Sequence, residues 1–257
     1  MRTVHVTRYV TPLREGGSLP AIVEADDDGL YVLKFRGAGQ GPRALVAELV
    51  AGELARVLGL PVPELVFVEL DAELARTEPD PEIQELIRAS AGLNLALDYL
   101  PGAVAFDPVA GRPEPELASE VVWFDAFTSN VDRTARNTNL LVWHRRLWLI
   151  DHGACLYFHH GTPWAAFAER ADERFPLIRD HVLLIGASDI SAADARLAPR
   201  LTAETIDAVT ALIPDRWLAD DGDADAQRAA YAAYLTRRAQ GPRSFVEEAT
   251  HARLSRV

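Results

Sequence analysis

The sequence predicts an α+β protein built from an N-terminal antiparallel sheet with one helix and a larger, mainly helical C-terminal part. Two observations support this prediction. Residues 3–36 form short apolar runs of strand type, and most segments after Pro101-Gly102 have apolar residues at helical spacing. We therefore expect one lobe over residues 1–100 and a second over residues 101–257.

Three strands are expected near the N-terminus. The first is the alternating run "TVHVTRYV", and the second is "LPAIVEA", with "REGGSLP" between them. The residues Asp26 to Gly29 supply turn chemistry before the third run, "LYVLKF". Consecutive strands joined by short turns predict hairpins or a meander, and therefore antiparallel pairing.

One helix interrupts the sheet. Residues 43–58 have apolar side chains at helical spacing and stop at Gly59, which predicts a helix with a glycine at its end. Residues 65–70 and 93–100 have the composition of strands, and the acidic segment 71–90 between them is expected to be helical.

The C-terminal part should begin with a helix over residues 115–130. The segment "LLVWHRRLWLID" consists of two apolar runs around a charged turn and predicts a hairpin. Four further helical patterns cover residues 163–185, 190–198, 202–213 and 225–250.

Composition excludes several classes of function. The chain has 49% hydrophobic and 25% charged residues, as ordinary globular proteins do, and its net charge of −12 disfavours binding to nucleic acid or to anionic membranes. With a single cysteine, Cys155, it can form neither an intrachain disulfide nor a multi-cysteine zinc site. Because no segment has the length and apolarity of a signal or membrane span, we expect a cytoplasmic protein.

The basic residues are almost all arginine. Of the 26 lysines and arginines, only Lys34 is a lysine. Codon bias explains this if one lysine survived by chance. Alternatively, position 34 requires a compact ammonium group that a planar guanidinium cannot replace, as in a buried phosphate site.

Five polar residues follow an order that suits phosphoryl transfer. Lys34 lies on a predicted strand and Glu48 on the next helix, between apolar residues. Asp132 and Asn137 have D-x-x-x-x-N spacing, and Asp151 follows an apolar strand. Phosphoryl transfer requires a cation on the phosphates, oxygen ligands for Mg²⁺ and an aspartate that orients the acceptor hydroxyl. Each residue alone has a structural explanation, but together they meet these demands.

Two segments resemble the HipA-like kinases, a family distantly similar to protein kinases and phosphatidylinositol kinases. They are "YVLKFRGAGQGPRALVAELVAGELARVLGLPVPE" and "FDAFTSNVDRTARNTNLLVWHRRLWLIDHG". The resemblance covers about residues 3–160 and implies a two-lobed, protein-kinase-like fold with ATP between the lobes.

The resemblance also implies a role for each matching residue. Lys34 would bind the α- and β-phosphates with Glu48 as its ion-pair partner, Asp132 would be the catalytic aspartate, and Asn137 and Asp151 would bind Mg²⁺. The backbone of Asp98, Tyr99 and Leu100 would contact adenine, and Gly16, Gly17 and Ser18 would form the loop over the phosphates.

Some positions depart from the protein-kinase pattern. The H-R-D motif is replaced by Asn130-Val131-Asp132, and His152 stands where D-F-G has phenylalanine. Two arginines, Arg133 and Arg136, either pair with acidic neighbours or contact phosphate or substrate. The "GAGQG" loop follows Lys34 and precedes the helix, which favours a mobile loop over the cleft rather than a dinucleotide fingerprint. We expect the adjacent His159 and His160 to be surface residues rather than metal ligands.

The leading hypothesis is an ATP- and Mg²⁺-dependent phosphotransferase acting on a serine or threonine hydroxyl of a protein, including its own chain. The resemblance leaves room for an antitoxin-like protein partner. Two other functions stay open, a small-molecule or lipid kinase and a nucleotide-binding pseudokinase that serves as an interaction module.

Overall fold

The computed structural model describes residues 1–13, 19–218 and 222–256. The fold is α+β, as the sequence predicts. The N-terminal part contains the strands β1 (Thr3–Pro12), β2 (Ala21–Ala25), β3 (Leu30–Lys34), β4 (Leu65–Leu70) and β5 (Gly92–Asp98), the helices α1 (Pro42–Leu58) and α2 (Pro81–Ala89), and the 3-10 helix η1 (Ala72–Thr77). The C-terminal part contains β6 (Val104–Ala105), α3 (Pro115–Thr128), β7 (Leu140–Trp143), β8 (Arg146–Leu149), α4 (Ile190–Leu197), α5 (Ala203–Thr210), α6 (Ala224–Gln240) and α7 (Ser244–Leu254).

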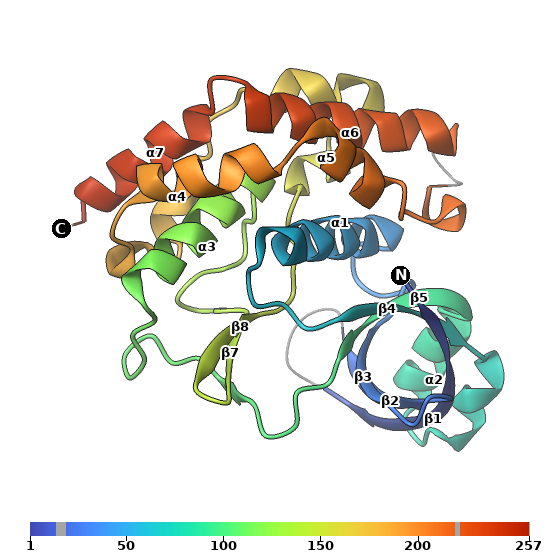
Figure 1. The fold of residues 1–257 in the computed structure, drawn as a ribbon. Coiled ribbons are helices and arrows are strands. Elements are labelled where there is room, and N and C mark those ends of the chain that lie inside the picture. The colour runs from blue at the N-terminus through green and yellow to red at the C-terminus, as the bar shows by residue number, and fades with distance from the viewer. Residues whose placement is uncertain (14–18, 219–221, 257) are drawn as a thin grey trace.

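The five N-terminal strands close into a barrel with the order β1-β2-β3-β5-β4 (Figure 1). Antiparallel pairs join β1 to β2, β2 to β3, β3 to β5 and β4 to β5, in agreement with the predicted sheet. The barrel closes through one parallel pairing, in which Thr3 lies opposite Phe67. Local turn signals do not reveal this pairing because the two strands are far apart in the sequence.

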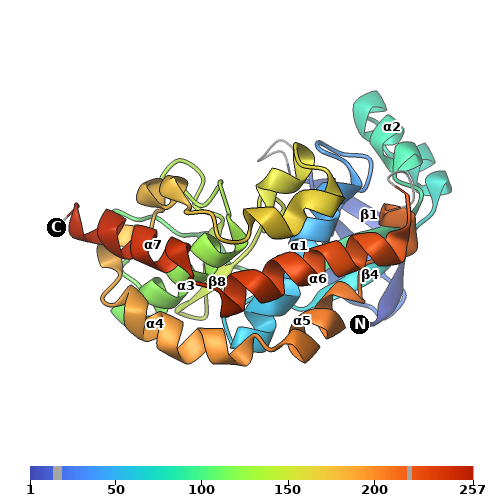
Figure 2. The same ribbon diagram turned by 90° about the horizontal axis from the view of Figure 1, so that it is seen from above.

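The alternation of side chains along β3 directs Lys34 out of the barrel. Tyr31 and Leu33 belong to the apolar core inside the barrel, so Lys34, three residues after Tyr31, lies on the opposite face. Helix α1 packs outside the barrel and shares its core with the C-terminal helices. Figure 1 shows α1 between the barrel and α5, and Figure 2 shows α6 passing over α1.

The ends and packing of α1 follow from its sequence. The helix starts with Pro42, whose missing N–H costs nothing in the first turn, and ends before Gly59, which has a left-handed φ of 81°. On the side facing the barrel, a Cβ on Gly52 would lie 2.9 Å from Cδ2 of Leu65. The helix therefore approaches β4 closely, which brings the neighbouring turn, with Glu48, near the end of β3.

Two of the segments predicted to be helical in the C-terminal part are not single continuous helices. The predicted segment 163–185 consists of three short 3-10 helices, η3 (Trp164–Arg170), η4 (Pro176–Asp180) and η5 (Leu184–Gly186). Residues 225–250 divide into α6 and α7 at Gly241-Pro242, because proline cannot donate the hydrogen bond that would continue a helix. Within the described ranges, no helix is long and apolar enough to cross a membrane.

The predicted hairpin forms between β7 and β8, and β6 adds a third strand to it. Its two turn residues, His144 and Arg145, both have left-handed φ angles, 48° and 62°. Such a turn matches the twist of the strands it connects. The end of β8 then leads directly to Asp151.

Candidate active site

Lys34 joins three segments that are distant in the sequence. Its Nζ lies 2.6 Å from Oδ1 of Asp151 and 3.5 Å from Oε2 of Glu48. Lys34 is 9% exposed and Glu48 1% exposed. The structure thus brings together the end of β3, the middle of α1 and the segment after β8, and the ammonium group lies between two carboxylates.

The charges of this cluster hold each other in the ionised state. Burial acts to lower the pKa of Lys34, but the charges of Glu48 and Asp151 outweigh it and raise that pKa. Burial acts to raise the pKa of Glu48, while the Lys34 charge and His152 lower it to about 2. His152, at the phenylalanine position of D-F-G, has Nδ1 3.6 Å from Oε1 of Glu48 and is fully buried.

Asp151 has an unusual backbone for a non-glycine residue. Its φ is 56°, in the left-handed region that side chains disfavour. Backbone strain of this kind gathers at functional sites. The Asp151 side chain is 37% exposed, unlike the two partners of the cluster, so it borders both Lys34 and solvent.

The loop before β7 holds the second half of the candidate site. Nδ2 of Asn137 donates to Oδ2 of Asp132 over 2.7 Å. The loop turns back on itself, because the Thr134 amide donates to the carbonyl of Asn137 over 2.9 Å. Asn139, which the sequence did not single out, donates from Nδ2 to the same Oδ2 over 3.2 Å.

The two residues assigned to a metal ion by sequence occur in separate pairs. Asn137 is bonded to Asp132, and Asp151 is bonded to Lys34. No hydrogen bond connects Asn137 with Asp151 in the part of the chain that the structure describes. Asn137 is exposed and the Asp151 side chain is 37% exposed, so each pair borders solvent.

A buried charge network lies beneath the loop. Oδ2 of Asp125, in α3, accepts hydrogen bonds from Nε of Arg133 over 2.6 Å and from Nε2 of His181 over 2.8 Å. Nδ2 of Asn130 donates to its Oδ1 over 3.0 Å. Arg133 therefore pairs with an acidic neighbour and has a structural role, which is the first of the two interpretations given above. Arg136 is exposed and makes no hydrogen bond or ion pair with any described residue.

In the segment expected to contact adenine, two of the three backbone amides already donate hydrogen bonds within the protein. The amide of Asp98 donates to the carbonyl of Glu64 over 2.8 Å, and that of Tyr99 to Leu30 over 2.9 Å. Among the described residues nothing accepts from the amide of Leu100. Of the loop assigned to the phosphates, Gly16, Gly17 and Ser18 lie outside the described residues.

The adjacent histidines are not both on the surface, so that prediction is wrong for one of them. His159 is fully buried, with Nδ1 2.9 Å from the Tyr231 hydroxyl and Nε2 3.1 Å from Nε2 of His160. Helical packing beside α6 buries it, which its neighbours in sequence do not indicate. Across the described ranges, no three His, Cys, Asp or Glu side chains form a group suited to a metal ion.

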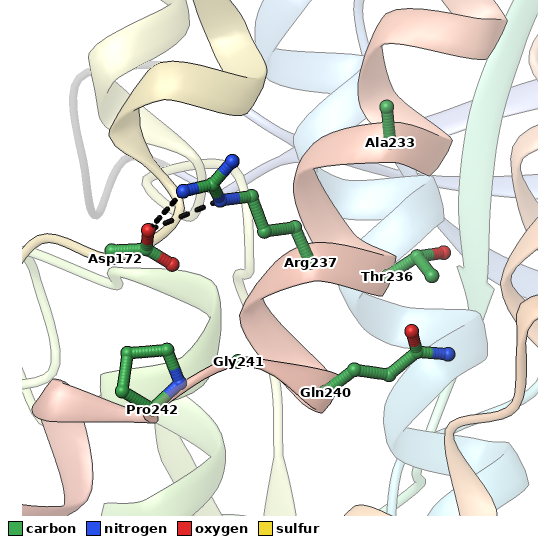
Figure 3. A pocket seen from close by; sticks show the side chains of 7 residues that line it. All are labelled: Asp172, Ala233, Thr236, Arg237, Gln240, Gly241 and Pro242. Carbon is green, nitrogen blue, oxygen red and sulfur yellow. Dashed lines mark hydrogen bonds and ion pairs between the residues drawn. The ribbon is translucent and has the colours of Figure 1, made fainter.

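An open groove of about 450 Å³ lies at the end of α6, away from these residues (Figure 3). Its walls include Asp172, Arg237 and Pro242, and the first two form an ion pair across it. None of the candidate site residues lines this groove.

Comparisons with known proteins agree with the geometry. A family model described as HipA-like kinase matches residues 6–241. Among solved structures, the Helicobacter pylori proinflammatory kinase CtkA is similar, with 13% identity, a TM-score of 0.56 and coverage of 98% of this chain and 99% of that chain. The Golgi casein kinase with Mn/ADP bound has 12% identity and a TM-score of 0.52, over 98% of this chain and 72% of that chain.

At such identities the likeness to solved structures establishes the fold, which is the two-lobed protein-kinase-like fold expected from the sequence. A search of curated proteins finds no match to this chain. The family model covers most of the sequence, from the first strand of the barrel to the end of α6. The chain belongs to the HipA-like kinase family.

Proposed function

We propose that this protein transfers the γ-phosphate of ATP, with Mg²⁺, to a serine or threonine hydroxyl of a protein, its own chain included. The observation that carries the proposal is the position of the Lys34 ammonium, 2.6 Å from Asp151 and 3.5 Å from Glu48. A buried lysine held between a helix glutamate and an aspartate after a hairpin is the arrangement that binds nucleotide phosphates beside a metal ion.

The residues present fit a divalent cation. Asp151 uses one carboxylate oxygen for Lys34, and Asn137 uses its amide nitrogen for Asp132. The remaining carboxylate and amide oxygens have no hydrogen-bond partner among the described residues, and Mg²⁺ prefers such oxygen ligands, few from protein and the others from phosphate and water. When bound, the cation neutralises phosphate charge. The similar Golgi casein kinase structure contains Mn and ADP.

Each remaining residue has a task that its geometry supports. Lys34 stays charged and would neutralise the phosphates, while Glu48 limits where its ammonium group can go. Asp132 has Oδ2 occupied by two amides, which leaves Oδ1 to accept the hydrogen of an acceptor hydroxyl. The Leu100 amide is the backbone donor that adenine would meet.

Incubation with MgATP followed by intact mass measurement tests the proposal. We expect a gain of about 80 Da for each phosphate on the wild-type chain or on an added protein, and its loss in Asp132→Ala. Lys34→Arg keeps the charge but not the compact ammonium, so it should stay folded and lose activity. A phosphate gain that persists in Asp132→Ala would contradict the role of Asp132.

The acceptor is tested by supplying MgATP with a protein extract, lipid vesicles or small alcohols in parallel. Phosphate on serine or threonine of a protein is the expected outcome. Transfer only to a lipid or small alcohol would replace the protein acceptor with the other kinase class. Tight nucleotide binding with no transfer to any acceptor would overturn the proposed activity and indicate a pseudokinase.

A further inference from the structure

Asn139 is a second amide on the catalytic carboxylate. Both Asn137 and Asn139 donate from Nδ2 to Oδ2 of Asp132, over 2.7 Å and 3.2 Å. The two amides differ in their surroundings. Asn137 is exposed, whereas Asn139 is 8% exposed. The exposed amide can rotate towards a ligand, but the buried one cannot move without disturbing the packing around it.

The backbone fixes the Asn139 side chain in place. Its φ of 48° is left-handed, a conformation that asparagine tolerates better than most residues. Its carbonyl accepts hydrogen bonds from the Ile150 amide over 3.1 Å and from Nη1 of Arg133. Arg133 is in turn paired with the fully buried Asp125 of α3. A continuous series of bonds therefore runs from the core of α3 to Asp132.

We propose that Asn139 is a positioning residue, which holds the Asp132 carboxylate in the orientation that presents Oδ1 to the acceptor hydroxyl. This inference rests on the proposed function. To bind a cation, Asn137 has to turn its amide oxygen towards it. The hydrogen bond from Asn137 to Asp132 therefore depends on whether the cation is bound. Asn139 has no such second task, and its bond persists whichever way Asn137 turns.

Two substitutions remove the donor while respecting the backbone. Glycine accepts a left-handed φ without strain, and aspartate tolerates it about as asparagine does. Asn139→Gly deletes the amide. Asn139→Asp keeps the shape but sets a carboxylate against Asp132. If the side chain serves only to fit the backbone, both variants should behave like the wild type.

The measurement is initial-rate ADP formation from ATP with Mn²⁺ as the cation, together with Mn²⁺ affinity by electron paramagnetic resonance in the presence of a non-hydrolysable ATP analogue. For both Asn139 variants we expect kcat to fall about 10- to 100-fold, as small misplacements of a catalytic group do. The KM for ATP and the Mn²⁺ affinity should stay within about twofold of wild type. The matched variant Asn137→Ala should instead weaken Mn²⁺ binding.

Wild-type kcat in both Asn139 variants, or Mn²⁺ affinity lost in both, would overturn the positioning role. A crystal structure of Asn139→Gly gives a readout that needs no turnover: we expect a rotated Asp132 carboxylate, and an unchanged one contradicts the proposal. If the wild-type protein forms no ADP, the proposed function fails, while the orientation of Asp132 still decides the role of Asn139.

Discussion

Two buried charge clusters differ in how completely their carboxylate oxygens are bonded. In the cluster under the loop before β7, Asp125 accepts from Asn130 on one oxygen and from Arg133 and His181 on the other. The Leu183 amide donates to Nδ1 of His181, so Nε2 carries the hydrogen that reaches Asp125. Every bond of this carboxylate is made within the protein.

The buried carboxylate next to Lys34 is less completely hydrogen-bonded than that of Asp125. Neither oxygen of Glu48 has a hydrogen-bond partner, and neither ring nitrogen of His152 has one, among the described residues. The other carboxylate next to Lys34, on Asp151, is partly exposed. Unsatisfied buried polar groups cost stability. Nη2 of Arg133 also has no hydrogen-bond partner among the described residues. The contrast therefore lies in the carboxylates: both oxygens of Asp125 accept hydrogen bonds, whereas neither oxygen of Glu48 does.

The largest effect is expected on stability at Asp125. In Asp125→Asn the new amide sets an N–H donor towards the donors of Arg133 and His181 and leaves a buried guanidinium without its counter-charge. Breaking a buried pair in this way costs about 3–5 kcal/mol. Urea unfolding at neutral pH measures the loss.

The control for this prediction is Asp172→Asn, which breaks the exposed pair with Arg237 shown in Figure 3. Solvent screens that pair, so the substitution should change unfolding little. If both variants unfold alike, the Asp125 cluster has no special structural role.

A large effect on activity, with a smaller loss of stability than in Asp125→Asn, is expected for Glu48→Gln. The variant loses the charge that positions Lys34, so activity should fall about 10- to 100-fold. Lys34 keeps its contact with Asp151, so no buried cation is left unpaired, and the free energy of unfolding should fall less than in Asp125→Asn. Steady-state kinetics with ATP measure the loss of activity, and urea unfolding measures the loss of stability. A large destabilisation without loss of rate would contradict a role of Glu48 in activity.

Acid should reveal the Glu48 charge as a smaller effect. The folded protein lowers the pKa of Glu48 from its ordinary 4.5 to about 2. A depressed folded pKa contributes stability above the ordinary value, and that contribution is lost as pH falls from about 4.5 to about 2. The free energy of unfolding should therefore decline less steeply over this range in Glu48→Gln than in wild type. Parallel slopes would show that the folded protein does not lower the pKa of Glu48.

The smallest effect is expected at Arg136. This side chain is exposed and bonds to no described residue, so Arg136→Ala should change the free energy of unfolding by less than about 0.5 kcal/mol. Arg133→Ala, three residues earlier, should resemble Asp125→Asn because it removes the guanidinium that balances the buried Asp125 charge. Urea unfolding of both variants checks the contrast, and equal losses would contradict the assignment of Arg133 alone to the structural cluster.

Local patterns anticipated most elements near the site. Helix α1 and the β7–β8 hairpin occur where periodicity and turn chemistry placed them, because short-range signals dictate both. The segment 163–185 was expected to be helical and is instead three 3-10 helices, of which η3 packs against α6 and η4 and η5 against α3 and α7. Asn139 and Asp125 gave no signal: a polar loop residue and a helical aspartate look ordinary until their partners are known.

The order of Lys34, Glu48, Asp132, Asn137 and Asp151 along the chain was enough to indicate phosphoryl transfer, because the chemistry requires those residue types and sequence records them directly. The kinase family was indicated by the resemblance of two longer segments. Only the tertiary structure decided which charges meet. It joined Lys34 to Asp151 across 117 residues, packed α1 into the core of the C-terminal helices, and buried Arg133 while leaving Arg136 in solvent. The burial of a side chain and its distance from a partner depend on long-range packing. Residue type and spacing in the sequence do not determine that packing for an individual position.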